Sequence, residues 1–394
     1  MANFTEIEEE LIGRISNQNN RLKTNLAKIR EVMEDLWSSD PVRIIQHFTD
    51  HGIKHSERIV RYACQILDTN NEIGLSDQEI YLLLSGIYLH DIGMQCDVAK
   101  LADIKTKAEE FGAKFNIEFK LCDGNYSKEM QKAIRKNHQI LTAAWIDYSN
   151  RTGESVLGPA AKEIDPRLVN DLIDICKYHS TFSINDCPIY STYYPTERKQ
   201  LIAALLRFAD ELDIEANRVT LETAKNFSIE PDNGVFWWMH NRTDIHFITA
   251  NMIQITIQLH PNDRANYGSL IQEVFIDEFR KKNEPVVDIL CRNGFPIHIS
   301  SDSKVIENDR LGLLPRDIVQ AIQKIKKHEN IQSSLAEEIK GWLESIGYNI
   351  SPPRKFSARA LDIDATLGRG LLQQRVLIRC FEGEVRQTDL GGFL

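Results

Sequence analysis

Between residues 41 and 218 the chain carries one helical pattern after another, and no segment alternates apolar and polar residues as a strand would. The predicted helices are SERIVRYACQIL, SDQEIYLLLSGIYLH, SKEMQKAIRKNHQILTAAWIDY, PRLVNDLIDICKYH and TERKQLIAALLRFADEL. Ser76 and Glu79 predict a capping box at the start of the second helix. SNRTGES and STFSINDCPIYSTYYP are rich in turn-forming residues and predict loops. This part of the chain therefore predicts a helical bundle.

The flanking segments predict different structures. Residues 1–40 predict an N-terminal helical arm that packs on the main core, with a dimer helix as the alternative; its apolar positions are Leu11, Ile15, Leu22, Leu26, Ile29 and Val32. After residue 218, NMIQITIQLH alternates as a half-buried strand, with VFWWMH and DIHFITA as neighbouring strands. YGSLIQEVFIDEFRKK predicts a helix and FPIHIS a further strand, which together give a small α+β domain at 219–305.

The last segment, 306–394, predicts a C-terminal α/β module. SSLAEEIKGWLESIGYNI has the pattern of a helix, while RALDIDATL and QQRVLIRCFEGEV have the pattern of strands. The predicted fold class is therefore mainly α, with a helical bundle followed by a small α+β domain and this module.

Composition narrows the class of protein. A net charge of −10 argues against a broad nucleic-acid-binding surface, which would be basic. No apolar run approaches the ~18 residues that a membrane span needs. The N-terminus, MANFTEIEEELIG, lacks a signal-peptide pattern, and the seven cysteines include no CxxC pair. We expect a cytoplasmic protein that does not contact membranes.

Two acidic residues stand where apolar side chains are expected. The apolar run YLLLSGIYL ends in His90 and Asp91, and buried charge is costly unless it is paired. Asp210 shares one helical face with Ile202 and Leu206. A buried aspartate bonded to the backbone, to Arg207 or to Arg218 would explain Asp210 structurally. A metal ligand supplied by the core is the functional interpretation.

Three more histidines occur in helical segments: His55 opens a helix, His138 lies within one, and His179 ends another. Each alone is more often structural than ligating. Together with His90, Asp91 and Asp210 they present imidazoles and carboxylates from five helices. Neutral imidazole and carboxylate are good ligands for divalent transition metals.

In this pattern the sequence resembles the HD superfamily of metal-dependent phosphohydrolases, whose signature is H…HD…D on a helical bundle. His55 in HSERI, His90 and Asp91 in LHDIG, and Asp210 in RFADELD match its three blocks over residues 41–218. The resemblance implies an HD domain there. It also implies that His138 and His179 complete a second metal site with Asp91 as the bridge. The alternative is a mononuclear site in which these two histidines contact phosphate.

The implied cofactor is one or two divalent ions (Mn, Fe, Ni, Mg or Zn), which would activate a water molecule for attack on a phosphate. Asp91 and His51 are the predicted catalytic residues, His51 as an acid or phosphate contact. The predicted substrate-binding cations are Lys54, Arg58, Lys177 and Arg218; solvated surface charge is the alternative for each. Trp237 and Trp238 could stack on a base, although strand residues in the core and at an interface are favoured.

The implied function is hydrolysis of a nucleotide, either a dNTP or NTP or a dinucleotide phosphate ester. A single-strand nuclease and a nucleotide-binding sensor with little turnover are the alternatives. TDHGIKHSERI and its setting resemble HD domains of bacterial defence proteins, which implies a role in antiphage defence. A homo-oligomer and a defence-system partner protein both fit that resemblance.

The C-terminal segment resembles the start of a restriction-endonuclease-like core, with Glu337, Glu338, Asp362 and Asp364 as its acidic residues. Active members of that family carry an acid and a lysine at the positions that are occupied here by Arg379, Cys380 and Phe381. The resemblance therefore implies a degenerate or truncated module, a partner-binding or nucleic-acid-sensing element without a nuclease site.

Overall fold

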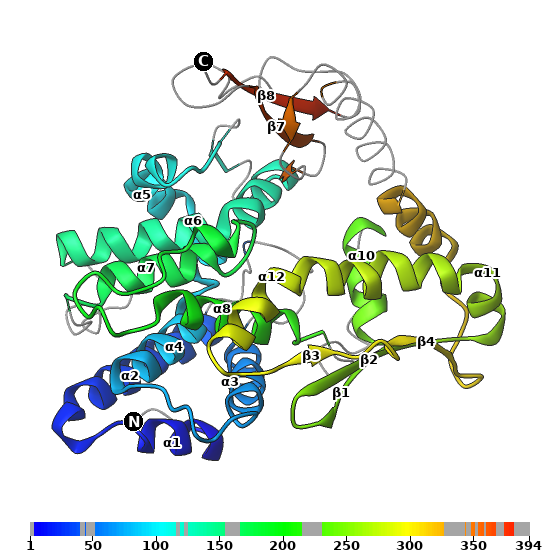
Figure 1. Ribbon diagram of the computed structural model, residues 1–394. Coiled ribbons are helices and arrows are strands. Elements are labelled where there is room, and N and C mark those ends of the chain that lie inside the picture. The colour runs from blue at the N-terminus through cyan, green and yellow to red at the C-terminus, as the bar shows by residue number, and fades with distance from the viewer. Residues whose placement is uncertain are drawn as a thin grey trace.

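The computed structural model describes residues 4–39, 44, 52–115, 119–121, 125–153, 166–214, 231–326, 343, 348–350, 354–357, 360–367 and 374–381. The fold is mainly α, as predicted (Figure 1). Helices fill one side of the molecule, and a small mixed sheet with its own helices lies on the other. In the described ranges, no helix is long and apolar enough to span a lipid bilayer.

The bundle is built from α1 (Glu6–Gly13), α2 (Asn20–Ser39), α3 (Ile53–Leu67), α4 (Asp77–Leu89), α5 (Val98–Glu110), α6 (Lys128–Thr152), α7 (Val169–Tyr178) and α8 (Lys199–Glu211). Short 3-10 turns follow α1 (η1, Asn17–Asn19), α4 (η2, Ile92–Gln95) and α7 (η4, Ile184–Asp186). Ser76 and Glu79 form the predicted capping box of α4. The α5 helix was not predicted from the sequence.

The N-terminal helices pack on the bundle core. Leu11, Ile15, Leu26 and Ile29 are buried, and α2 lies against α4. The predicted helical arm is interrupted between Arg14 and Asn19. There the chain turns because the Ser16 N–H, the Ser16 hydroxyl and the Asn19 amide all donate to Asp77, at the start of α4.

The second unit contains α10 (Pro231–His240), β1 (Thr243–Thr249), β2 (Met252–Leu259), α11 (Pro261–Ile271), a π-helical turn η6 (Gln272–Asp277), α12 (Glu278–Arg292), β3 (His298–Ile299) and β4 (Lys304–Glu307). The strand predicted for VFWWMH is wrong, because this segment belongs to α10. A short apolar run has no period long enough to separate a buried helix from a strand. The other predicted strands and the helix of this unit are confirmed.

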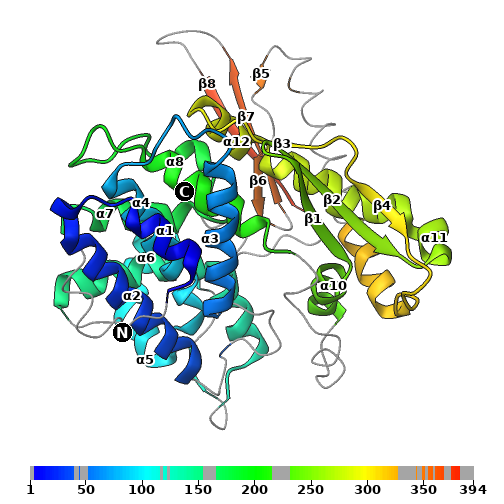
Figure 2. The ribbon, with the colours of Figure 1, turned by 90° about the horizontal axis from the view of Figure 1, so that it is seen from below.

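Strand β2 is the centre of the first sheet. It pairs antiparallel with β1 and, along its other edge, parallel with β3 and then β4. The α11 and α12 helices cover one face of this sheet (Figure 1). The α3 helix lies between α2 and β1 in both views, and Tyr62 of α3 stacks on Phe247 of β1 at 6.5 Å (Figure 2). The α12 helix packs on α8, which joins the two units.

The C-terminal strands form a second, antiparallel sheet. It comprises β5 (Asn349–Ile350), β6 (Arg354–Ser357), β7 (Ala360–Leu367) and β8 (Gln374–Phe381). The strands predicted in RALDIDATL and QQRVLIRCFEGEV are β7 and β8. Asp362 and Asp364 lie in β7, in register with Arg379 and Leu377 of β8. Glu337 and Glu338 lie outside the described residues.

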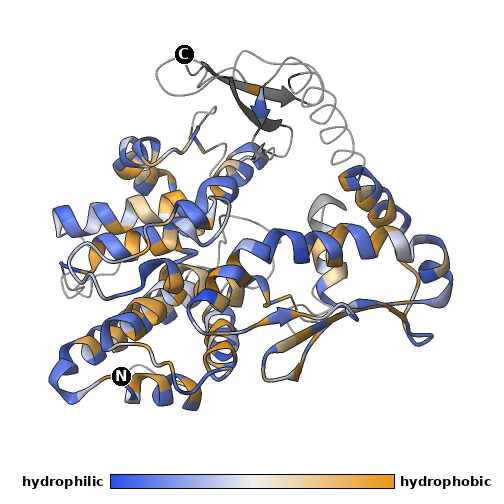
Figure 3. Cartoon of the chain, in the orientation of Figure 1, coloured by the Kyte–Doolittle hydropathy of each residue, from blue (hydrophilic) through white to orange (hydrophobic). Residues whose placement is uncertain are grey.

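Hydropathy follows the packing of the bundle. Figure 3 shows bundle helices on which apolar and polar stretches alternate, as expected where one face is buried. The α4 helix is the exception, because every residue from Glu79 to Leu89 is buried. This fully buried helix delivers His90 and Asp91 into the interior of the bundle.

Candidate metal centre

The six predicted ligands come from five helices and meet at one place. His55 lies in the first turn of α3, His90 caps α4, and Asp91 follows it directly. His138 lies within α6, His179 caps α7, and Asp210 is in the last turn of α8. Four of the clustered residues are buried, namely His55, His90, Asp91 and His179. The Asp210 side chain is 23% exposed. The cluster thus lies inside the bundle and opens to solvent on one side.

Hydrogen bonds fix the orientation of all four imidazoles. The Nδ1 atoms of His90, His138 and His179 lie 2.8, 2.7 and 2.5 Å from the backbone carbonyls of Ile87, Arg135 and Cys176. His55 Nδ1 lies 2.6 Å from the Asp213 carboxylate. Carbonyls and carboxylates only accept, so each Nδ1 carries the proton. Every neutral ring therefore turns an Nε2 lone pair toward the centre of the cluster.

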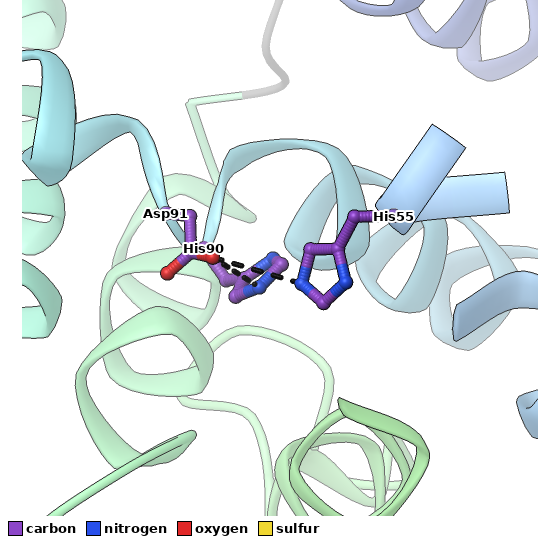
Figure 4. A group of neighbouring side chains, drawn as sticks. All are labelled: His55, His90 and Asp91. Atoms are coloured by element: carbon purple, nitrogen blue, oxygen red, sulfur yellow. Dashed lines mark ion pairs between the residues drawn. The ribbon is translucent and has the colours of Figure 1, made fainter. Parts of the chain in front are cut away.

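Asp91 lies between two pairs of these Nε2 atoms. Its Oδ2 is 3.1 Å from His90 Nε2 and 3.7 Å from His55 Nε2, which Figure 4 shows converging on the carboxylate. Its Oδ1 is 3.4 Å from His138 Nε2 and 3.9 Å from His179 Nε2. Asp210 Oδ1 lies 3.2 Å from His55 Nε2 and 3.9 Å from His90 Nε2.

The donor set fits a bound metal. His138 Nε2 and His179 Nε2 lie only 3.1 Å apart, although the Nδ1 protons leave both as acceptors. Two lone pairs at that distance repel unless a cation lies between or beside them. Three overlapping groups have ligand atoms within 4.8 Å of one another: His55, His90 and Asp91; His90, His179 and Asp210; and Asp91, His138 and His179. Ligating histidines typically donate their other ring N–H to a carbonyl or carboxylate, as here.

The charges in the cluster also favour a cation. Burial disfavours a charged His90, but the Asp91 and Asp210 carboxylates outweigh it and raise the pKa of His90 to about 9. Burial and the neighbouring His90 and His138 rings lower the pKa of His179 to about 3. Burial opposes ionisation of Asp210, yet the adjacent His55 and His90 lower the pKa of its carboxyl below its usual range. Positive charge is thus favoured beside the carboxylates.

Three of the predicted phosphate-binding cations, Lys54, Arg58 and Lys177, contact other protein groups in the part of the chain that the structure describes. Lys54 is 72% exposed and pairs with Glu57 at 2.9 Å. Arg58 donates from Nε to Asp213 at 2.7 Å, and Lys177 lies over the rings of Phe111 and Phe182. Arg218 and His51 lie outside the described residues. Trp237 is buried in α10, and the Trp238 ring lies 5.0 Å from the Arg242 guanidinium carbon.

Other polar side chains line the open side of the cluster. A cleft of about 410 Å³ is lined by Asp91, Met94, Lys132, Arg135, Lys136, His138, Ser180, Thr181 and Asp210. Sequence reasoning missed the cations of α6, although KAIRKNH contained the signal. Lys132, Arg135 and Lys136 have the i, i+3, i+4 spacing of one helical face and come just before His138.

Asp213 is a second residue that sequence reasoning missed. It is fully buried, and its carboxylate accepts from both His55 Nδ1 and Arg58 Nε. Its position three residues after Asp210 in ADELD was the available signal. Arg207 does not pair with Asp210 by hydrogen bond; it donates to the Phe182 carbonyl at 2.6 Å.

Histidines and aspartates from five helices of one bundle meet at a single buried site. This arrangement defines an HD-type domain with a candidate metal centre. The chain belongs to the HD-CE family, whose model matches residues 45–277, more than half of the sequence. The match spans all six clustered residues and continues through β1 and β2 into η6. Comparison with curated proteins and with solved structures gives no match.

Proposed function

We propose that the protein is a metal-dependent phosphohydrolase of the HD superfamily that acts on phosphate ester or phosphoanhydride bonds of a nucleotide. The observation that carries this proposal is the position of Asp91. Each of its two oxygens faces a different pair of histidines whose Nδ1 atoms are already engaged. This arrangement supports one carboxylate bridging two divalent ions.

In this proposal the six clustered residues divide between two ions. His55, His90 and Asp210 would hold the first together with Asp91, and His138 and His179 would hold the second together with Asp91. Imidazole with carboxylate suits Mn, Fe, Ni or Zn. The single-ion alternative, with His138 and His179 on phosphate, is less well supported because their Nε2 atoms also face Asp91 Oδ1.

A bound divalent ion lowers the pKa of its water and offsets charge on phosphoryl oxygens. The chain's own groups do the rest. Carbonyls of Ile87, Arg135 and Cys176 keep three rings in the tautomer that offers Nε2. The cleft admits a phosphate beside Asp91 and Asp210. In the reaction a water oxygen would bond to phosphorus and the P–O bond to the leaving group would break. The water would give up one proton, and the leaving oxygen would take up one.

A phosphate substrate is favoured over a neutral ester or amide because the cleft wall is basic. Lys132, Arg135 and Lys136 line the same cleft as Asp91 and Asp210. Cations beside a metal centre complement the charge of transferring phosphoryl groups. A small nucleotide is favoured over a long single strand because the chain's net charge is −10. A sensor that binds a nucleotide with little turnover is the second candidate.

The test is hydrolysis by the full chain, purified and loaded with Mn²⁺, against panels of nucleotides and labelled oligonucleotides. We expect phosphate or nucleoside monophosphate release that is lost in His90→Ala and Asp91→Asn and retained in His260→Ala, which changes a histidine outside the cluster. Product release that survives His90→Ala and Asp91→Asn would contradict the proposed centre. Tight nucleotide binding with no product would favour the sensor.

A further inference from the structure

We propose that Lys132, Arg135 and Lys136 of α6, together with Ser180 and Thr181, form a second phosphate subsite beside the metal centre. The substrate of this chain would then carry at least two linked phosphoryl groups. This inference rests on the proposed function, because the first phosphoryl group is the one held at the metal centre.

The subsite adjoins the metal centre through α6. Lys132, Arg135 and Lys136 share one face of the helix, and His138 follows within the next turn. All of them line the same cleft as Asp91 and Asp210. Since the Arg135 carbonyl also accepts the Nδ1 proton of His138 at 2.7 Å, the cationic face and the ligand are fixed to one backbone segment. A linked phosphate could reach both.

The two lysines are available for an anion. Within the described part of the chain, neither Lys132 nor Lys136 has an acidic partner, and both are exposed. Lysines of the neighbouring α5 differ: Lys100 pairs with Asp103 at 3.3 Å and Lys107 with Glu110 at 3.0 Å. Unpaired cations that line one concave surface raise the local concentration of anions.

Arg135 is the fixed member of the subsite. It is half-buried, and its guanidinium carbon lies 5.5 Å from the centre of the Phe236 ring of α10. Stacking against an aromatic ring restricts the motion of a guanidinium.

Thr181 adds a neutral donor to the lining of the cleft. Its hydroxyl oxygen accepts from the Gln139 amide at 2.5 Å, which leaves the hydroxyl proton to be donated elsewhere. Ser180, the neighbouring residue, also lines the cleft. Hydroxyls paired with cations in this way are common contacts of phosphate oxygens.

The charges match more than one phosphoryl group. Two divalent ions held by Asp91 and Asp210 leave roughly two positive charges, enough for one phosphoryl dianion. Lys132 and Lys136 remain after that match. They complement a further phosphoryl group, as in a nucleoside diphosphate or triphosphate. A monophosphate ester would leave both lysines without a ligand.

The experiment compares inorganic triphosphate with orthophosphate as ligands of the Mn²⁺-loaded full chain, freed of unbound metal, by titration calorimetry. We expect triphosphate to bind at least about tenfold more tightly. The Lys132→Ala, Lys136→Ala double variant should lose about tenfold in triphosphate affinity and little in orthophosphate affinity. Arginine at both positions should restore triphosphate binding.

The matched control is Lys281→Ala, Lys304→Ala, which removes the same charge from exposed lysines of α12 and β4 outside the cleft. It should bind both ligands as the wild type does. A double variant of α6 that binds triphosphate normally, or that loses both ligands equally, would overturn the inference. If wild type shows the triphosphate preference but hydrolyses no nucleotide, the proposed function fails and the subsite stands. If it hydrolyses nucleotides and the α6 variant is unimpaired in triphosphate binding, the subsite fails instead.

Discussion

At the scale of single residues, the candidate centre depends on which ring nitrogen faces inward. The sequence could indicate the six clustered residues because each occurs in a recognisable local setting, such as LHDIG or RFADELD. It could not indicate what holds the rings. Three of the four Nδ1 partners are backbone carbonyls, which every residue carries. The partners of Lys54 and Arg58 likewise became clear only once Glu57 and Asp213 were placed.

Asp213→Asn tests the orientation of His55. The amide keeps the shape of the side chain but removes the charge that Nδ1 contacts at 2.6 Å. We expect the affinity for Mn²⁺ to fall by about 10–100-fold, as is typical when the outer partner of a ligating histidine is changed. Metal titration of purified protein measures this. Asp288→Asn, on the exposed side of α12, is the control, and equal affinities in the two variants would contradict the assigned role of Asp213.

At the scale of elements, helix ends place the ligands. The α4 and α8 helices each span 13 residues and pack together. At their first turns, Glu79 accepts from the backbone and guanidinium of Arg198. At their far ends lie His90 and Asp91 on one helix and Asp210 on the other. The contact between Glu79 and Arg198 thus aligns the two helices that carry half of the clustered residues.

Gly93→Ala tests how closely η2 approaches α6. A Cβ at Gly93 would meet the His138 carbonyl oxygen at 2.1 Å and the Thr142 nitrogen at 2.8 Å, and backbone atoms of a helix cannot move aside cheaply. We expect a loss of about 1–3 kcal/mol in the free energy of unfolding, with weaker metal binding. Denaturant unfolding with metal titration measures both. Gly13→Ala, where nothing lies within 4 Å, is the control. A Gly93 variant that matches it would contradict the packing.

Glu79→Gln tests the alignment of α4 and α8 through pH. Burial opposes ionisation of Glu79, but its bonds from Arg198 and Ser76 outweigh burial and lower the pKa of the carboxyl below 4.5. The stabilisation is therefore complete above pH 4.5 and is lost as the pH falls through the folded-state value. We expect the free energy of unfolding of the wild type to exceed that of the variant by about 2 kcal/mol near neutral pH. This difference should shrink below pH 4.5.

Unfolding free energies measured between pH 3 and pH 7 would show this, and a difference that stays constant or grows in acid would contradict it. Asp302→Asn, at an exposed turn after β3, controls for a general effect of removing one acid.

The elements that sequence patterns predicted best are long and amphipathic, such as α6 and α8, where the period repeats several times. The failures have specific physical causes. The segment VFWWMH is too short for its period to distinguish helix from strand. The break before η1 depends on Asp77, which lies far along the sequence, so no local pattern at Ser16 could indicate it.

At the scale of the whole molecule, the bundle and the α+β unit pack against each other. The family match runs from residue 45 to residue 277, and α12 packs on α8 with Lys282 bonded to Glu211. Phe236 of α10 also reaches Arg135 at the cleft. A side chain of the α+β unit therefore contacts Arg135, which lines the cleft of the candidate site.

The N-terminal helices are also part of the bundle. Arg30 of α2 is buried and pairs with Glu8 of α1 at 3.1 Å, Glu57 of α3 at 2.9 Å and Glu34. Tyr88, two residues before His90, donates to the same Glu8 carboxylate at 2.7 Å. One charged cluster therefore links α1, α2, α3 and the end of α4.

Arg30→Met tests this cluster. Removing the cation leaves buried Glu8 without its counter-charge, which typically costs about 3–5 kcal/mol of folding free energy. Thermal and denaturant unfolding measure the loss. Arg14→Met, which removes an exposed arginine paired with Glu10, should cost less than about 1 kcal/mol. Equal losses in the two variants would show that the N-terminal helices do not stabilise the bundle in this way.

The proposed function requires Asp91 to join two histidine pairs around two cations. Elemental analysis of the purified chain, saturated with Mn²⁺ and then freed of unbound metal, measures how many ions it holds. We predict about two ions per chain in wild type, about one in His138→Ala, and fewer than one in Asp91→Ala. Wild type that retains no ion, or His138→Ala that retains as many ions as wild type, would contradict it.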